Sequence, residues 1–578
     1  MKRPITVMKL TAGRWNLNNI PPFLIPLLGA LLVYGLKPRF GNLLFVVISA
    51  MLFFYLLLLL DKNAELQITW LNLTIMPLKA DPLSLVFGSV FSLLLVLGGI
   101  FAYHITDKIQ QIAALLYGSA AMCVIFAGDL LTLLIGWEVM ALASAMLIFQ
   151  NNTKSSHSAA LRYLFVHLVG GTLLLAGILW CFAETMTLEL RHFDFQPYSA
   201  LILLGVAINA AIVPFHAWLP DAYPKATTTG AVFLGALTTK TAVYVLARGF
   251  HGWDILILAG VIMALYGLAY ALVQNDIRRV LAYDIVSQVG FMVAAIGIGG
   301  HNGINAAAAH AFAHVLYNAL LFMSVGSLIF VSSKASLNGL SGFGRSIPLI
   351  MILYIIGAFS VSAFPGFGAF GSKYLILHAA EEQHLNWVVM LLYLTSVGTF
   401  IAVGLRIPYL LLLNISGDKP KQLPGNMFMA MVITGVFCVG LGAAPWLLFE
   451  RLPYETHISP YNMANMMRTV HLIVFASFAF WVFRRRFSPN NKVLLDFDWF
   501  YRKAGLPIKT FVQIPLEKLF SSTEWLVNNV TDIGIKQATD QKGLIAKVTS
   551  TRFSLNIAIS SVVLTLCAMT LIIFMANS

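Results

Sequence analysis

One lysine stands inside a long apolar segment. Lys240 lies in the run AVFLGALTTKTAVYVL, residues 231–246, about ten residues into the helix that this pattern predicts. At that depth in a membrane an ammonium group costs several kcal/mol unless it is used or paired. A buried lysine also gives up its proton readily, which suits a proton carrier. The alternative is snorkelling to the membrane surface, but a lysine stem does not span that distance comfortably.

Four other apolar segments carry groups that could hold or pass a proton. Glu138 has no ion partner nearby in the sequence, which favours a functional role. His310 and His314 lie one helical turn apart, a spacing that suits a relay; a metal pair has the same spacing, but no carboxylate or third ligand is within reach. His167 fits a core hydrogen bond or a place on a proton path equally well. Asp284 lies about one turn into its helix, where an interfacial position is preferred to one inside the protein.

The composition is that of a membrane protein. Hydrophobic residues make up 59% of the 578 positions, and charged residues make up 11%. Soluble domains carry about twice that share of charge. The net charge of +13 does not indicate nucleic-acid binding, because no compact nucleic-acid module is present and many basic residues fall in short loops. The cysteines are predicted to be buried, inert thiols without metal-ligand spacing: Cys123, Cys181, Cys438 and Cys567.

The chain contains sixteen apolar segments of membrane-spanning length. An even number places both termini on the same side of the membrane. Lysine and arginine concentrate in the odd-numbered loops, so these loops are predicted to face the cytoplasm and both termini to face outward, although the basic N-terminus argues against this orientation. The segments are 20–37, 41–60, 81–103, 109–127, 128–149, 158–184, 198–221, 226–249, 252–274, 277–299, 303–331, 346–379, 386–413, 427–449, 467–484 and 555–575.

Two segments contain a proline at which the helix is predicted to break. Pro214 lies in the seventh segment, and Pro365, with glycines close by, lies in the twelfth. Proline removes a backbone donor and clashes with the preceding turn. Broken helices at matching places in two halves indicate an ion site in transporters built from inverted repeats, and these two lie five segments apart. For either helix alone, the alternative is that prolines are common in membrane helices.

The predicted fold is therefore an all-α multi-pass membrane protein with two inverted five-helix repeats. Its expected divisions are N-terminal flanking helices (1–105), a first repeat (106–250), a second repeat (251–415), C-terminal flanking helices (416–490), a lateral segment (491–553) and an anchor helix (554–578).

Six motifs follow one another between residues 80 and 415. They are GWEVM (136–140), PFHAWLPDA (214–222), LTTKTAVY (237–244), DIRRVLAY (276–283), HAFAH (310–314) and GAFGSK (368–373). In this order they resemble the antiporter-like subunits of respiratory complex I and of Mrp-type cation/proton antiporters, with the Mrp-type subunits the more similar. The resemblance implies a polar axis through the membrane midplane that carries protons with the help of water. On this chain it assigns that axis to Glu138, Lys240, His310, His314 and Lys373.

Two positions depart from the family pattern. Asn209 stands where the family usually has a lysine before the first helix-breaking proline, and Asn318 stands where it usually has a lysine after the second histidine. Asparagine can hydrogen-bond to water but cannot take up or release a proton near neutral pH. Glu138 consequently lacks the cation that the resemblance would place beside it. A proton path remains possible, but the usual arrangement of charges is altered.

The C-terminal region after Arg486 has mixed polarity from 496 to 550. Segments such as IPLEKLF at 514–520 place apolar residues at three- and four-residue spacing, which predicts an amphipathic helix lying at the cytoplasmic interface. The stretch resembles a shortened form of the lateral helix in larger family members, which is closed by an anchor span. A solvated linker is the alternative.

The sequence thus predicts a proton-translocating subunit of a multi-subunit complex in the bacterial cytoplasmic membrane. Its expected partners are other membrane subunits, lipid, protons and possible Na⁺, with coupling to cation/proton antiport or to a redox module supplied by partners. Two alternatives stay open: a silenced scaffold, and a membrane partner in inorganic-carbon uptake. No flavin, quinone, nucleotide or iron–sulfur motif is present, so no cofactor and no redox or hydrolytic site of its own is expected, although it could still be a subunit of a translocase.

Overall fold

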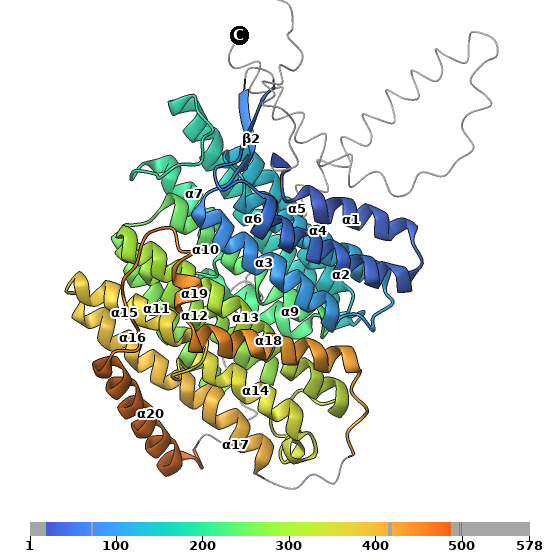
Figure 1. The fold of residues 1–578 in the computed structure, drawn as a ribbon, viewed down its shortest axis with the longest axis vertical. Coiled ribbons are helices and arrows are strands. Elements are labelled where there is room, and N and C mark those ends of the chain that lie inside the picture. The colour runs from blue at the N-terminus through green and yellow to red at the C-terminus, as the bar shows by residue number, and fades with distance from the viewer. Residues whose placement is uncertain (1–18, 71–72, 414–418, 487–495, 498, 500–578) are drawn as a thin grey trace, which may run out of the picture. The chain divides into compact units, whose positions relative to one another are not determined.

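The computed structural model describes residues 19–70, 73–413, 419–486, 496–497 and 499. All but the last belong to one compact unit, Met1–Asp498. Apart from one hairpin, its elements are helices (Figure 1). The first ten α-helices are α1 (Leu24–Gly35), α2 (Pro38–Phe54), α3 (Pro82–Phe101), α4 (Lys108–Ile125), α5 (Leu130–Phe149), α6 (Lys154–Thr185), α7 (Pro197–Asn209), α8 (Trp218–Ala222), α9 (Gly230–Leu234) and α10 (Leu237–Gly249).

The second half of the unit continues in the same manner. Its helices are α11 (Asp254–Val273), α12 (Ile277–Ile298), α13 (Gly300–Ser332), α14 (Pro348–Val361), α15 (Ala369–Glu382), α16 (Asn386–Thr399), α17 (Ile407–Leu412), α18 (Gly425–Ala443), α19 (Trp446–Phe449) and α20 (Met463–Phe483). Short 3₁₀ turns are η3 (Phe215–Ala217), η4 (Tyr223–Lys225) and η5 (Phe343–Ser346), and π-helical turns are η2 (Tyr55–Leu59) and η6 (Phe400–Arg406).

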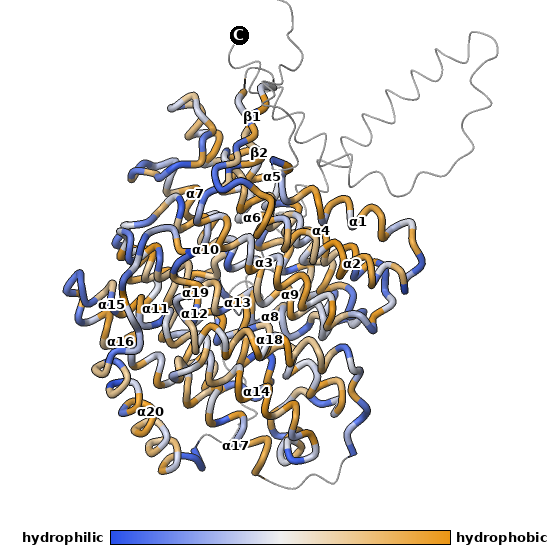
Figure 2. The backbone as a smooth tube through the Cα atoms, viewed as in Figure 1, coloured by the Kyte–Doolittle hydropathy of each residue, from blue (hydrophilic) through white to orange (hydrophobic). Residues whose placement is uncertain are grey.

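Within the described residues, 12 helices are long and apolar enough to cross a membrane. Figure 2 shows apolar residues running along the helices and hydrophilic residues gathering in the connections between them. Fifteen of the sixteen predicted segments coincide with helical stretches. The sixteenth, 555–575, and almost all of the lateral segment lie outside the described residues. The chain is therefore a multi-pass membrane protein.

Helix α13 lies at the centre of the unit and packs against α3, α12, α14, α15 and α18 (Figure 1). Helix α10 packs against α4, α7, α12 and α13. Both helices bury almost every side chain, so polar groups on them are shielded from solvent and lipid. These two helices carry Lys240 and the two histidines.

The chain leaves helical conformation at both predicted breaks. Helix α7 ends at Asn209, and α14 ends at Val361. Two residues beyond each end stands an alanine in the left-handed region, Ala211 with φ 57° and Ala363 with φ 55°. The helical path resumes only after Pro214 and Pro365 respectively, as the loss of a backbone donor dictates.

A buried and a half-buried carboxylate cap the first turns of helices α5 and α12. Asp129 caps α5 by accepting from the backbone of its first turn, and Asp276 caps α12 in the same way. Each of these residues also forms an isolated bridge to a later loop, Asp129 with Glu189 and Asp276 with Ser336. Asp129 further accepts from Met76 N at 2.7 Å, which ties the hairpin to the start of α5.

Three features have no counterpart in the sequence predictions. An antiparallel hairpin, β1 (Glu65–Trp70) with β2 (Leu73–Lys79), fills the connection between α2 and α3. The predicted helix 226–249 is interrupted between α9 and α10, at Gly235 and Ala236. The predicted helix 386–413 contains the π-helical turn η6. Pro408, just after η6, removes the donor to the Gly404 carbonyl and marks the second interruption, whereas no proline lies near the first.

Candidate functional site

Lys240 is inside the protein. It lies in the first turn of α10 and is 0% exposed, so the snorkelling alternative is wrong. Its Nζ donates to the Gly235 carbonyl at 2.8 Å and to Thr239 Oγ1 at 3.1 Å. Gly235 stands at the interruption between α9 and α10. The amide of Asn318 on α13 donates to the same carbonyl at 2.8 Å, so the asparagine and the lysine share one acceptor.

Lys373 repeats this arrangement in the second half. The side chain is buried on α15, and its Nζ donates to the carbonyl of Val361, the last residue of α14, at 2.9 Å. It lies 3.4 Å from Ser396 Oγ and 4.6 Å from the centre of the Phe291 ring. Each buried ammonium is therefore held by a carbonyl where a helix is broken. Such carbonyls lack a complete set of helical donors and can accept from a cation.

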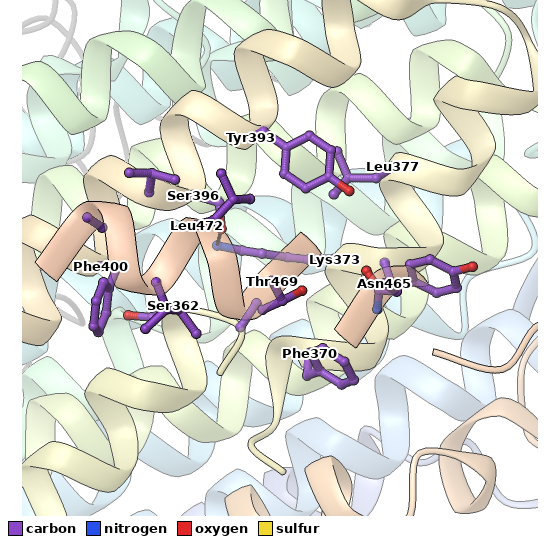
Figure 3. Close-up of a pocket in the computed structure, with 15 residues that line it drawn as sticks. Ser362, Phe370, Lys373, Leu377, Tyr393, Ser396, Phe400, Asn465, Thr469 and Leu472 are labelled. Atoms are coloured by element: carbon purple, nitrogen blue, oxygen red, sulfur yellow. Dashed lines mark hydrogen bonds between the residues drawn. The ribbon is translucent and has the colours of Figure 1, made fainter. Parts of the chain in front are cut away.

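A small cavity of about 40 Å³, partly open to the surface, adjoins Lys373 between α15, α16 and α20. Figure 3 shows the Lys373 side chain reaching toward Ser396 among the residues that line this cavity. Near its rim, Arg468 forms a half-exposed ion pair with Glu381 at 2.7 Å. The lining mixes apolar side chains with hydroxyl and amide groups. The polar residues of the lining are Ser362, Tyr374, Tyr393, Ser396, Asn465 and Thr469.

The two histidines of α13, His310 and His314, interact electrostatically with both Lys240 and Lys373. Both are 0% exposed, and their ring centroids are 6.4 Å apart. His310 Nδ1 lies 3.0 Å from Ser372 Oγ, next to Lys373 in the chain. His310 Nε2 and both ring nitrogens of His314 have no hydrogen-bond partner among the described residues. Buried nitrogens of this kind need a mobile partner such as water, which a proton relay also requires.

Asp284 is also buried. It is 3% exposed on α12, so the preferred interfacial position is wrong: packing by neighbouring helices covers a residue that the sequence places near a helix end. Gln288 Nε2 donates to its Oδ1 at 3.2 Å. The charge of Asp284 interacts with both Lys373 and Lys240. Its charge therefore acts on the two ammonium groups from a distance, without a direct ion pair among the described residues.

Glu138 stands apart from this cluster. It is half-buried on α5 and lies against Gly171 of α6, where an added Cβ would collide with its Oε1. No lysine, arginine or histidine of the described chain pairs with it. Asn209, at the end of α7, is fully buried, and neither polar atom of its side chain has a hydrogen-bond partner in the described part of the chain. Glu138 therefore has no cation partner, and Asn209 has no hydrogen-bond partner, in the described part of the chain.

His167 is buried on α6. Its Nδ1 lies 2.9 Å from the Tyr163 carbonyl, which can only accept, so the proton is on Nδ1. The ring stacks on that of Tyr163 at 4.0 Å. Its Nε2 has no hydrogen-bond partner among the residues that the structure describes. The core hydrogen bond predicted as one alternative is present, and one nitrogen remains available as a proton acceptor.

Of the seven residues predicted to lie on a proton path, five interact with one another. The other two, Glu138 and His167, are not part of that group. Lys240, His310, His314, Lys373 and Asp284 interact electrostatically with one another. Sequence reasoning missed the carbonyls that hold the lysines, because they depend on where helices break. It also missed a cluster of buried hydroxyl groups around Thr238, whose only signal was tyrosine and threonine within apolar helices.

The transmembrane part of the chain matches a known family. The family described as NADH:quinone oxidoreductase/Mrp antiporter, TM, matches residues 127–401, the range that holds every group of the cluster. This part of the chain is therefore similar to the members of that antiporter-like family.

Individual relatives support that assignment. The chain is 32% identical over 314 residues to NADH-quinone oxidoreductase subunit L of Escherichia coli, covering 49% of this chain and 50% of that protein. It is 26% identical over 513 residues to Na(+)/H(+) antiporter subunit A1 of Staphylococcus haemolyticus, covering 78% of this chain and 64% of that one. It therefore spans half to two thirds of the length of these two antiporter-like proteins.

A solved structure has the same fold. A chain of the Mrp complex from Dietzia sp. DQ12-45-1b superposes with a TM-score of 0.63 at 19% identity, covering 80% of this chain and 97% of that chain. At this identity the likeness concerns the fold alone. The membrane fold implied by the six sequence motifs is confirmed at this level.

Proposed function

We propose that this antiporter-like chain is a proton-translocating subunit of a multi-subunit complex in the bacterial cytoplasmic membrane. The observation that carries the proposal is the pair of buried lysines, Lys240 and Lys373, each held by a carbonyl at a helix break. A buried lysine that served only packing would be costly. A lysine that alternates between neutral and charged states uses that environment.

Within this path, each group has a distinct role. Lys240 and Lys373 hold the transferred proton, and His310 and His314 pass it between them with water at their unpartnered nitrogens. Asp284 supplies one negative charge that either lysine can use, so protonation of one disfavours protonation of the other. The likeness of the two breaks, with an alanine in the left-handed region beyond each, supports the two inverted repeats, 106–250 and 251–415.

The sequence shows no flavin, quinone, nucleotide or iron–sulfur motif. The driving force for proton translocation is therefore an ion gradient or a redox reaction in a partner subunit. By analogy with the named relatives, cation/proton antiport with Na⁺ and a partner redox module are the two candidate couplings. The rival, a silenced scaffold, is favoured by Asn209 and Asn318. The two hypotheses differ in one measurable property, which is proton movement by the assembled complex.

Proton flux through the purified complex in proteoliposomes tests the proposal. We expect an imposed membrane potential to drive proton uptake, reported by an internal pH-sensitive dye. Lys373→Met removes the charge but keeps much of the side-chain volume, and it should reduce this flux at least tenfold because the cavity beside α20 would lose its proton donor. Lys154→Met, at an exposed lysine, is the matched control. A parent complex that carries no protons under any gradient would favour the scaffold.

Asp496, in the C-terminal region, contacts residues of η3, α11 and α12 in the same compact unit. Asp496 Oδ1 lies 3.2 Å from His216 Nε2 and accepts from the Tyr266 hydroxyl at 2.6 Å, and its other oxygen accepts from Tyr283. Burial opposes ionisation of this carboxyl, but these contacts outweigh it and lower its pKa to about 2. Because the pKa is below its ordinary value of 3.8, the contact stabilises the folded chain above about pH 4 and is lost as the pH falls toward 2.

Truncation after Arg486 would remove this contact and everything beyond it. Both halves of the membrane unit would remain, so we expect the subunit to insert normally but to copurify with its partners at least fivefold less well. Asp496→Asn in the full chain, with an intact backbone, separates loss of the contact from loss of the segment. Normal yield of the complex from the truncated chain would favour the interpretation of 496–550 as a linker.

A further inference from the structure

Four hydroxyl groups from four different helices meet in the first half of the unit. Tyr117 of α4 and Thr238 of α10 lie 2.6 Å apart at their oxygens, and the backbone N–H of Thr238 donates to the Tyr117 hydroxyl at 2.9 Å. The Tyr163 hydroxyl of α6 lies 3.5 Å from the same threonine oxygen and 2.8 Å from Ser144 Oγ of α5. None of the four side chains is more than 1% exposed.

This arrangement exceeds what packing needs. Apolar side chains fill helix interfaces without polar atoms, and each buried hydroxyl must find a partner. Here the hydroxyls of Tyr117, Thr238 and Tyr163 pair with hydroxyls of other helices, and Ser144 also donates to the Met140 and Ala141 carbonyls of its own helix. The buried hydroxyl of Tyr223 has no hydrogen-bond partner among the described residues. A hydroxyl both donates and accepts, so a connected series of them can pass a proton by rotation.

One face of α6 connects this cluster to Glu138. Tyr163, His167 and Gly171 are spaced four residues apart and therefore lie along the same stripe of the helix. Glu138 lies against Gly171, the His167 ring stacks on Tyr163, and the Tyr163 hydroxyl enters the cluster. His167 Nε2 has no partner in the described chain, so it can accept a proton.

The other end of the cluster approaches Lys240. Thr238 and Lys240 belong to the same turn of α10, and Thr239 between them accepts from Lys240 Nζ at 3.1 Å. Water must carry three steps of such a route: from Glu138 to His167, from His167 Nε2 to the Tyr163 hydroxyl, and from the hydroxyl cluster to Thr239 or the amine.

We propose that Glu138, His167, Tyr163, Thr238 and Tyr117 form a proton branch that reaches Lys240 around Asn209. The branch rests on the proposed conduction and names a route for it in the half of the protein that lacks a lysine before the first break. For each proton passed, every hydroxyl forms one O–H bond and breaks another, and rotation then restores the starting arrangement. His167 gains a proton on Nε2 and releases it again, so no oxidant or further reactant is consumed.

The reconstituted complex tests the branch through matched substitutions. Thr238→Val keeps the shape of the side chain and removes its oxygen, whereas Thr238→Ser keeps the oxygen. We expect proton flux to fall at least fivefold in Thr238→Val and in Tyr117→Phe, and to stay within twofold of the parent in Thr238→Ser. Tyr55→Phe is the control, because Tyr55 is a buried tyrosine whose hydroxyl donates to the Ile20 carbonyl far along the chain from the cluster.

A geometric variant and an isotope effect separate a relay from a structural role. Gly171→Ala would place a Cβ on the position of the Glu138 carboxylate and should reduce flux as Thr238→Val does. Among variants that assemble normally, the ratio of flux in H₂O to flux in D₂O should rise, since hydroxyl transfer becomes limiting. Loss of flux in Lys240→Ala with parental flux and isotope ratio in Tyr117→Phe and Thr238→Val would overturn the branch alone. Absence of flux in the parent would overturn the proposed function itself.

Discussion

Replacing Lys240 with alanine is expected to abolish proton movement by the assembled complex. The variant removes the amine that the Gly235 carbonyl and Thr239 hold in the centre of the protein. Lys240→Arg should be nearly as damaging, because a guanidinium stays charged and cannot release its proton near neutral pH. Proteoliposome flux should fall at least tenfold in both variants.

The structure also predicts that Lys240→Ala assembles. Asn318 continues to donate to the Gly235 carbonyl, so the interruption between α9 and α10 keeps a hydrogen bond. The loss of flux would then reflect the missing amine rather than an unsatisfied backbone. Lys79→Ala, at a partly exposed lysine paired with Glu189, provides the matched control. Full transport by Lys240→Ala would refute the path through this residue.

Local signals made part of the site predictable. An ammonium within an apolar run is anomalous whatever its tertiary surroundings, so Lys240 stands out from the sequence alone. Prolines 214 and 365 break helices for a reason that acts within one turn, and the chain departs from helix near both. The roles of Glu138 and Lys373 in a proton path, by contrast, are inferred from a family resemblance and stay predictions.

Tertiary packing decided the rest. Asp284 lies close to the start of α12, which favoured the interface, but neighbouring helices bury it. The carbonyl that holds Lys240 depends on an interruption at Gly235, where no proline marks a break. Tyrosine and threonine in apolar helices look like ordinary packing until the hydroxyls of four helices are seen to converge on Thr238.

The two asparagines are therefore not equivalent. Asn209 has no hydrogen-bond partner in the described chain, whereas Asn318 donates to the carbonyl that also holds Lys240. A neutral donor at 318 lets Lys240 carry the only charge at that carbonyl. The substitution thus has a structural consequence at the site itself, which a family comparison of residue types does not reveal.

Asn318→Lys is expected to inhibit a working conductor strongly. It would place a second ammonium beside the first, and two such charges about 5 Å apart repel by about 3 kcal/mol at an effective dielectric constant of about 20. Protonation of Lys240 would become unfavourable by roughly that amount, so flux should fall at least tenfold. Asn318→Leu removes the hydrogen bond without adding charge, and it should retain more flux than the lysine variant.

Asn305→Lys controls for the general cost of a buried lysine on α13. Asn305 lies on the same helix, is 1% exposed and also donates to a backbone carbonyl, that of Tyr454. Its lysine variant should reduce assembly as Asn318→Lys does but, per assembled complex, should leave flux closer to the parental value.

The scaffold hypothesis predicts the reverse pattern: no flux in the parent, and a proton leak when lysines replace Asn209 and Asn318 together. A leak that appears only in that double variant would show that the two asparagines silence the path, and equal flux in Asn318→Lys and the parent would show that the shared carbonyl does not tune Lys240.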